Sequence, residues 1–235
     1  VMELLENVWE RAKVAADAEQ REIENYLKDN NIELEGGVQA YDWRFYAEKV
    51  RKAKYDFDDS LLKPYLTLDS VRDSLFAVSN KLFGLKYSKV DSPTYHADVE
   101  VFEVRESAND GTDRLVSVFL HDNFSRPFKS GGAWMSEYRG QSKNLVGADS
   151  IDGIPIISNN NNLAKGTEVT LLSPDDARTM FHEFGHAHHG MLSDVTYSRL
   201  SGTNVLTDFV ELPSQLMEHW LDYAFENARH YQTGE

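Results

Sequence analysis

The sequence contains no cysteine among its 235 residues, which excludes a disulfide framework and a zinc site built from thiolates. It has no apolar run near the roughly 20 residues that a membrane-spanning helix needs. Positive charge is scarce: 24 lysines and arginines stand against 39 acidic residues, which gives a net charge of −15. Such a chain is a poor partner for nucleic acids and anionic membranes. We therefore expect a cytoplasmic protein that binds neither.

The first part of the chain has the periodicity of helices. Apolar residues recur every three or four positions over residues 2–29, 42–54 and 69–83, with charged residues between them. The third segment begins at Asp69 or Ser70 and ends near Gly84, a residue typical of helix C-termini. The pattern predicts a helical part over residues 1–90.

The periodicity changes from 3.6 to 2 beyond residue 90. Residues 97–104 and 114–120 alternate polar and apolar side chains around turn-forming residues 107–112, which is typical of an antiparallel hairpin. Further short strands are expected at 133–138 and 154–157. The four asparagines at 159–162 predict a loop. Residues 91–235 should therefore contain a small antiparallel or mixed sheet.

The most informative stretch is H-E-F-G-H at residues 182–186, which has the pattern H-E-x-x-H. It lies in a predicted helix, because Ser173 is a typical N-cap and an apolar stripe at helical spacing follows it. On that helix His182 and His186 lie one turn apart and can bind one metal ion. Glu183 lies beside them, where a carboxylate can act on a water molecule.

A catalytic zinc site of this kind needs a third protein ligand. The metzincin pattern H-E-x-x-H-x-x-G-x-x-H does not fit, because His189 and Leu192 stand where its glycine and third histidine should be. Glu211 has apolar neighbours on both sides, which indicates a buried carboxylate that needs a partner such as zinc. The residues alone leave other downstream acids open: Asp194, Asp208, Glu218 and Asp222.

These motifs resemble the thimet oligopeptidase family of zinc peptidases. The resemblance rests on residues 181–190, on L-S-G-T-N at 200–204 and on D-F-V-E-L-P-S-Q at 208–215. It implies that His182, His186 and Glu211 hold one Zn²⁺ per chain and that Glu183 is the general base. G-G-A-W-M at 131–135 and the pair His189-Gly190 are similar to the bacterial peptidyl-dipeptidase branch.

Residues around this centre have predicted supporting roles. Histidine ligands usually donate their second N–H to a carboxylate or carbonyl group. Asp208, one turn before Glu211, and Glu218, two turns after it, are both candidates, and the residues alone do not choose between them. His189 lies on the same helical stripe as the ligands, and we expect it to support the site without binding the metal.

Gly131, Gly132, Ala133 and Trp134 are candidates for substrate binding. Paired glycines allow another chain to approach closely, so this stretch can form an exposed edge strand that pairs with a peptide backbone. In the similar family the corresponding strand lines the cleft. A turn that simply enters an ordinary strand explains the same residues equally well.

The sequence therefore predicts an α+β, mainly helical, zincin-like fold with a small sheet beside the H-E-x-x-H helix. The function expected is zinc-dependent hydrolysis of short peptides, of the peptidyl-dipeptidase or oligopeptidase type. The resemblance also implies a longer enzyme, of which residues 1–90 and 91–235 form one compact central fragment.

Two alternatives to a complete peptidase stay open. The family's Tyr and His residues that polarise the scissile carbonyl and hold the substrate C-terminus lie well downstream of the third ligand, beyond Glu235. The chain could therefore bind zinc yet cleave poorly, and exposed apolar surface would then favour its self-association. A purely structural zinc site, with four protein ligands, is the remoter alternative.

Overall fold

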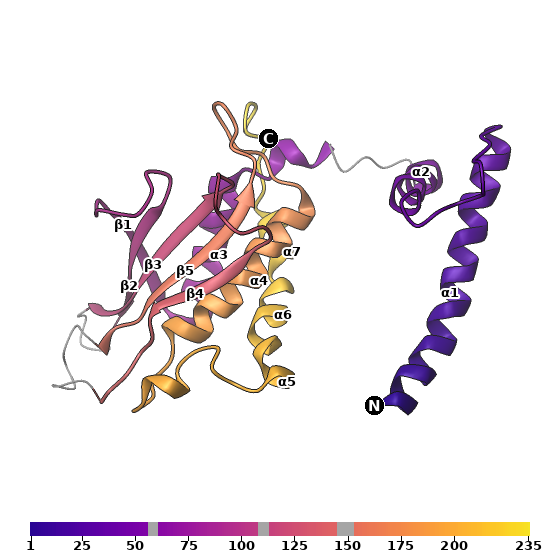
Figure 1. The fold of residues 1–235 in the computed structure, drawn as a ribbon. Helices are drawn as coiled ribbons and strands as arrows, with labels where there is room; N and C mark the ends of the chain where they lie inside the picture. Colours follow the sequence, from indigo (N-terminus) through magenta and orange to yellow (C-terminus); the bar gives the residue numbers. More distant parts are fainter. Residues whose placement is uncertain (56–60, 108–112, 145–152) are drawn as a thin grey trace. The chain divides into compact units, whose positions relative to one another are not determined.

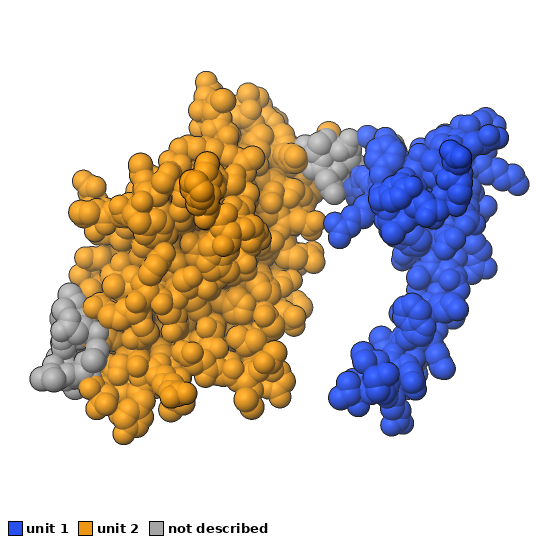
Figure 2. Space-filling view, viewed as in Figure 1, with its two compact units in different colours: residues 1–58 blue, residues 59–235 orange. Residues whose placement is uncertain are grey.

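The computed structural model describes residues 1–55, 61–107, 113–144 and 153–235 (Figure 1). The chain forms two compact units, Val1–Asp58 and Asp59–Glu235 (Figure 2). The second unit combines a five-stranded mixed sheet with helices, which confirms the α+β class. The units divide at residue 58 and not near residue 90, because helix α3 (Leu68–Phe83) packs against the sheet and belongs to the second unit.

The first unit contains the long helix α1 (Met2–Asp29) and helix α2 (Trp43–Tyr55), as the apolar periodicity predicts. Only the C-terminal part of α1 has buried side chains, Ile23 and Leu27. Lys54 and Glu22 form an exposed ion pair between the two helices. In the part of the chain that the structure describes, no helix is both long and apolar enough to cross a membrane.

The sheet of the second unit has the strand order β1-β2-β3-β5-β4. Its strands are β1 (Leu85–Val90), β2 (Glu100–Ser107), β3 (Asp113–Phe124), β4 (Trp134–Arg139) and β5 (Ile156–Leu163). The predicted hairpin of β2 and β3 is confirmed, although residues 108–112 of its turn lie outside the described residues. β3 and β5 run parallel, and the other pairs are antiparallel. β4 is thus an edge strand, and β1 is a strand that the sequence analysis did not predict.

The prediction of a loop at residues 159–162 is wrong, because these asparagines belong to β5. β5 lies between β3 and β4, so its backbone pairs on both sides. Three of the four side-chain amides form hydrogen bonds: Asn160 donates to the Trp134 carbonyl, Asn161 donates to Asn123 Oδ1, and Asn162 donates to the carbonyls of Ser130 and Gly132. The preference of asparagine for turns is a weak signal, and pairing between strands distant in sequence overrides it here.

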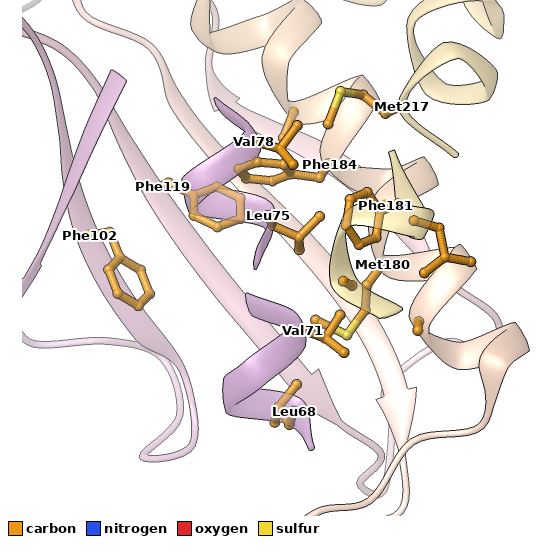
Figure 3. Close-up of a cluster of buried hydrophobic side chains, with 14 of the residues drawn as sticks. Leu68, Val71, Leu75, Val78, Phe102, Phe119, Met180, Phe181, Phe184 and Met217 are labelled. Carbon is orange, nitrogen blue, oxygen red and sulfur yellow. The ribbon is translucent and has the colours of Figure 1, made fainter. Parts of the chain in front are cut away.

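Helices α3 and α4 (Pro174–Met191) cover one face of the sheet and form the main core with it (Figure 3). The apolar stripe predicted for α4 is buried here, and Phe184 packs with its ring centroid 5.5 Å from that of Phe119 on β3. Both helices begin with a capping box, at Thr67–Ser70 and at Ser173–Asp176. Caps and core together fix α4, the helix that carries H-E-x-x-H.

His188 connects these two helices inside the core. Its side chain is buried, and Nε2 shares a 2.7 Å hydrogen bond with Ser79 Oγ on α3. Burial lowers the pKa of His188 to about 3. An unfolded histidine titrates near 6.5, so between pH 6.5 and about 3 the unfolded chain binds a proton that the folded chain does not. The free energy of unfolding therefore decreases as the pH falls through this range.

We expect this histidine to lower the free energy of unfolding by about 2 kcal/mol between pH 7 and pH 5. In His188→Leu this part of the pH dependence should be absent, whatever the stability of the variant at pH 7. Urea unfolding of both proteins at the two pH values measures it. Equal pH dependence in the wild type and the variant would contradict the prediction.

Candidate metal centre and active site

Helix α4 and the junction between two short helices bring the predicted ligands together. His182 and His186 project from α4, and Glu211 lies between α5 (Thr207–Val210) and α6 (Leu212–Glu218). Oε2 of Glu211 is 3.2 Å from Nε2 of each histidine. Ligand atoms of the three residues all lie within 4.8 Å of one another. Glu211 thus meets the two histidines although it follows His186 by 25 positions in the sequence.

A glycine lets α6 approach closely enough for this. A Cβ atom at Gly185 would lie 2.4 Å from the Pro213 carbonyl oxygen and 2.5 Å from Cα of Ser214. The helices therefore meet backbone to backbone immediately beside the two histidines. The helical segment is interrupted at Glu211, which separates α5 from α6, and α7 (Leu221–Glu226) follows.

Glu211 is not buried as its apolar neighbours indicated; its side chain is 49% exposed. Those neighbours include Phe209 and Leu212, which are themselves exposed on the two short helices, so they cannot enclose the carboxylate. Ser214 Oγ donates a 2.7 Å hydrogen bond to Glu211 Oε2. This bond, and then the two histidines, lower the pKa of Glu211 and keep the side chain ionised.

Glu218 is the acid that lies against a histidine of the cluster. His182 Nδ1 donates to Glu218 Oε1 over 2.8 Å, which leaves the Nε2 lone pair pointing at Glu211 Oε2. Asp208 is exposed, and the structure gives it no hydrogen bond or ion pair among the described residues. Of the two candidates that the sequence left open, the geometry therefore places only Glu218 against His182.

These donors suit zinc. Two imidazole nitrogens and one carboxylate oxygen form a common ligand set for catalytic Zn²⁺, and they leave a fourth position free. Burial lowers the pKa of His186, which favours the neutral ring that metal binding requires. The hydrogen bond of Glu218 holds His182 in the tautomer with a free Nε2. The residues present therefore fit the metal that the sequence motif implies.

His189 lies one turn beyond His186 and is not among the converging donors. Its ring contacts Phe209, with centroids 6.1 Å apart, and Nδ1 is buried without a hydrogen-bond partner among the residues described. Burial lowers the pKa of His189. Its position beside the α5 segment that precedes Glu211 suits a packing role.

Glu183 is the one acid on α4 that is buried, with 6% of its surface exposed. Its Oε2 atom has no hydrogen-bond partner in the described part of the chain. Burial raises the pKa of Glu183 to about 7; the charge of Glu211 adds to this effect, and His182 opposes it. A carboxyl group with a pKa near neutrality can both accept and return a proton at physiological pH.

A hollow of about 370 Å³ opens beside the cluster. Its walls are formed by the start of β4, by α4, by the segment before α5, and by the end of α5 with Glu211. The lining residues are Ala133, Trp134, Met135, His182, Glu183, His186, Thr203, Val210 and Glu211. Ala133 and Trp134 thus lie at the candidate site. Met135, Thr203 and Val210 were not predicted, because no local pattern distinguishes a lining residue from an ordinary one.

Gly131 and Gly132 form the turn that leads into β4 and are not among the residues lining this hollow. Gly132 has a φ of +82°, a conformation that glycine adopts without strain. Asn162 holds the turn by donating to the carbonyls of Ser130 and Gly132 over 2.6 and 2.7 Å. The glycines therefore lead into β4, which begins at Trp134, two residues after Gly132.

Comparison with known proteins shows which family the chain belongs to. The model of peptidase family M3 matches residues 1–235. The chain is 42% identical to a dipeptidyl carboxypeptidase of Salmonella typhimurium, over 92% of this chain and 31% of that protein. It is 43% identical to the Escherichia coli dipeptidyl carboxypeptidase, over 84% of this chain and 28% of that protein. An oligopeptidase A of Haemophilus influenzae is 34% identical over the whole chain and 34% of its own length.

The chain thus spans about a third of the length of these relatives. The family model matches every residue, and identities above 30% extend over most of the chain. This chain belongs to peptidase family M3.

Proposed function

We propose that the chain carries the catalytic centre of a zinc metallopeptidase that hydrolyses short peptides. The convergence of His182, His186 and Glu211 beside the buried Glu183 is the observation that carries the proposal. A zinc ion held by these ligands would supply Lewis-acid chemistry, lowering the pKa of water to about 7 and polarising a carbonyl oxygen.

The chain's own residues account for the proton transfers. Glu183 lines the hollow, and its carboxylate accepts a proton from the water molecule that attacks the peptide carbonyl carbon. As the C–N bond breaks, Glu183 returns that proton to the leaving amine. No covalent bond between chain and substrate is needed.

The substrate is proposed to lie along β4. Among the described residues this strand pairs with β5 on one side only, and Trp134 and Met135 line the hollow. An extended peptide can add to the free edge as a further strand, which would bring one of its carbonyls over the metal ligands. Gly131 and Gly132 leave room at the start of this edge, where a Cβ atom would meet no atom within 4 Å.

Removal of dipeptides is the more specific proposal, and the identities favour it over cleavage within oligopeptides. The two relatives named dipeptidyl carboxypeptidase are 42% and 43% identical to the chain, whereas the relative named oligopeptidase A is 34% identical. A peptide with a blocked N-terminus tests it, since a dipeptidyl carboxypeptidase should release C-terminal dipeptides from it one after another. Products from internal cleavage alone would favour the oligopeptidase type.

A second candidate is a centre that binds zinc but turns over slowly by itself. Glu211 is half exposed and the hollow is shallow and open on the described surface, so water is poorly excluded from the reacting groups. Donors that stabilise the developing oxyanion are worth about 10²–10³ in rate, and the described lining residues do not include a tyrosine or a further histidine. Full zinc content with very low turnover would support this alternative.

The metal part of the proposal predicts one zinc ion per chain. His182→Ala should remove tight binding, because two protein ligands seldom suffice for a catalytic site. Elemental analysis of the purified proteins measures the stoichiometry, and His219→Ala is a matched control, since His219 is exposed and lies outside the converging donors. Full zinc content in His182→Ala would show that the ligand assignment is wrong.

A further inference from the structure

The side chain of Asn159 has an unusual environment for a buried amide. It is 2% exposed, and neither Nδ2 nor Oδ1 has a hydrogen-bond partner among the described residues. Leaving a buried polar group unpaired costs about 1–3 kcal/mol, so such a group is expected to have a function. The other three asparagines of β5 use their amide nitrogens in hydrogen bonds.

The sheet register places Asn159 on the face that α4 covers. Ile157, two residues earlier on β5, belongs to the core with α4, and residues two apart share a face of the sheet. Asn159 pairs across the sheet with Met135 on β4. Paired residues share a face, and Met135 lines the same hollow as Glu183. Asn159 therefore lies on β5, the strand next to β4, and β4 lines the hollow through Met135.

The geometry of α4 places Glu183 above this part of β5. A Cβ atom at Gly190 would lie 2.7 Å from Cδ1 of Ile157, so Gly190 is over Ile157. Glu183 is seven residues before Gly190, about two helical turns, and thus lies on the same face of the helix. One turn further, Thr179 lines a hollow together with Asn161. Along α4, Glu183 lies between Gly190 and Thr179. Along β5, Asn159 likewise lies between Ile157 and Asn161.

Only one asparagine can serve Glu183 as a donor. Glu183 Oε2 is buried and unpaired among the described residues, and an ionised carboxylate can only accept. The Nδ2 of Asn161, on the same face, already donates to Asn123 Oδ1 at 3.0 Å. Asn160 alternates to the opposite face, and the Nδ2 of Asn162 already donates to the carbonyls of Ser130 and Gly132. Asn159 Nδ2 is the remaining unpaired donor of the four.

We propose that Asn159 is a positioning residue for the general base: its amide nitrogen donates to Glu183 Oε2, directly or through one buried water molecule. The bond would hold the carboxylate with its other oxygen toward the hollow, where the attacking water lies. Catalytic hydrogen bonds are often long in the absence of substrate and shorten when the site is assembled. The inference rests on the proposed role of Glu183 as base.

The first test detects the contact between Asn159 and Glu183 without measuring turnover. In the zinc-loaded chain with ¹³C-labelled glutamate, the Glu183 carboxyl resonance is identified by its loss in Glu183→Gln. Asn159→Leu, which keeps the shape of the side chain without its donor, should move this resonance, and Asn159→Ala should do the same. Asn161→Leu is the matched control and should leave it in place. An unmoved Glu183 resonance in a folded Asn159 variant would overturn the proposal.

The second test separates positioning from folding. Asn159→Leu should lower kcat by about 10–100-fold, the usual loss for a removed orienting partner, with KM and zinc content unchanged. Added to Glu183→Gln, it should cause no further loss, because the group it positions is gone. If Asn159→Leu lowered kcat both in the wild type and in Glu183→Gln, its effect would be a general structural one. If Glu183→Gln itself keeps its turnover, the proposed base is wrong, while the resonance shift still reports on the contact.

Discussion

Replacing Glu183 with Gln should remove most of the turnover while leaving the fold and the zinc content intact. Glutamine has nearly the same shape as glutamate, but its amide cannot accept the proton of the attacking water. General base catalysis contributes about 10²–10⁴-fold, so kcat should fall by that factor. The effect should fall mainly on kcat, because the group acts on the reacting water and does not hold the peptide.

The measurement is the cleavage rate of a blocked peptide, with zinc content determined on the same samples. Asp175→Asn is a matched control: it makes the same change of charge on the same helix, but Asp175 is exposed in the first turn and away from the hollow. It should cleave like the wild type. Turnover near the wild-type rate in Glu183→Gln would remove Glu183 from the mechanism.

The parts of the fold set by neighbouring residues were predictable from the sequence. The N-cap at Ser173, the proline after it and the apolar stripe predicted α4, and the spacing of His182 and His186 put both rings on one side of it. Alternating side chains predicted the hairpin of β2 and β3. Such signals extend over at most two or three helical turns, so they locate elements without saying what packs against them.

What the sequence did not reveal depends on contacts between distant residues. The asparagines of β5 are polar and turn-forming locally, and only the strands on either side explain their burial. Glu218 contacts His182 across 36 positions, and the choice between it and Asp208 depends on how α6 is rotated. The exposure of Glu211 similarly depends on what covers its neighbours, which its apolar flanks cannot show.

Gly185 shows what local sequence patterns predict and what they miss. Within the motif it lies between Phe184 and His186 and has no evident role in metal binding. Alanine is favoured over glycine inside a helix by about 1 kcal/mol, so local reasoning predicts that Gly185→Ala stabilises α4. The structure predicts the opposite for the protein, because the new methyl group would lie 2.4 Å from the Pro213 carbonyl oxygen. Overpacking of this kind typically costs about 1–3 kcal/mol.

The larger effect of Gly185→Ala should fall on metal binding. α6 must move away from α4 to admit the methyl group, and Glu211 is the residue that starts α6. Its Oε2 lies 3.2 Å from both histidines, so a displacement of about 1 Å separates the third ligand from the other two. Zinc affinity, measured by competition with a chelator, should fall by at least about tenfold even though all three ligands are present.

Gly131→Ala is the control for adding a methyl group, because its Cβ would meet no atom within 4 Å. It should keep the zinc affinity of the wild type. If Gly185→Ala also kept that affinity, the close approach of α4 and α6 would not be what brings Glu211 to the histidines. If affinity falls while the helix content of the chain stays the same, the glycine of H-E-F-G-H is required for the distance between two helices and not for the helix in which it lies.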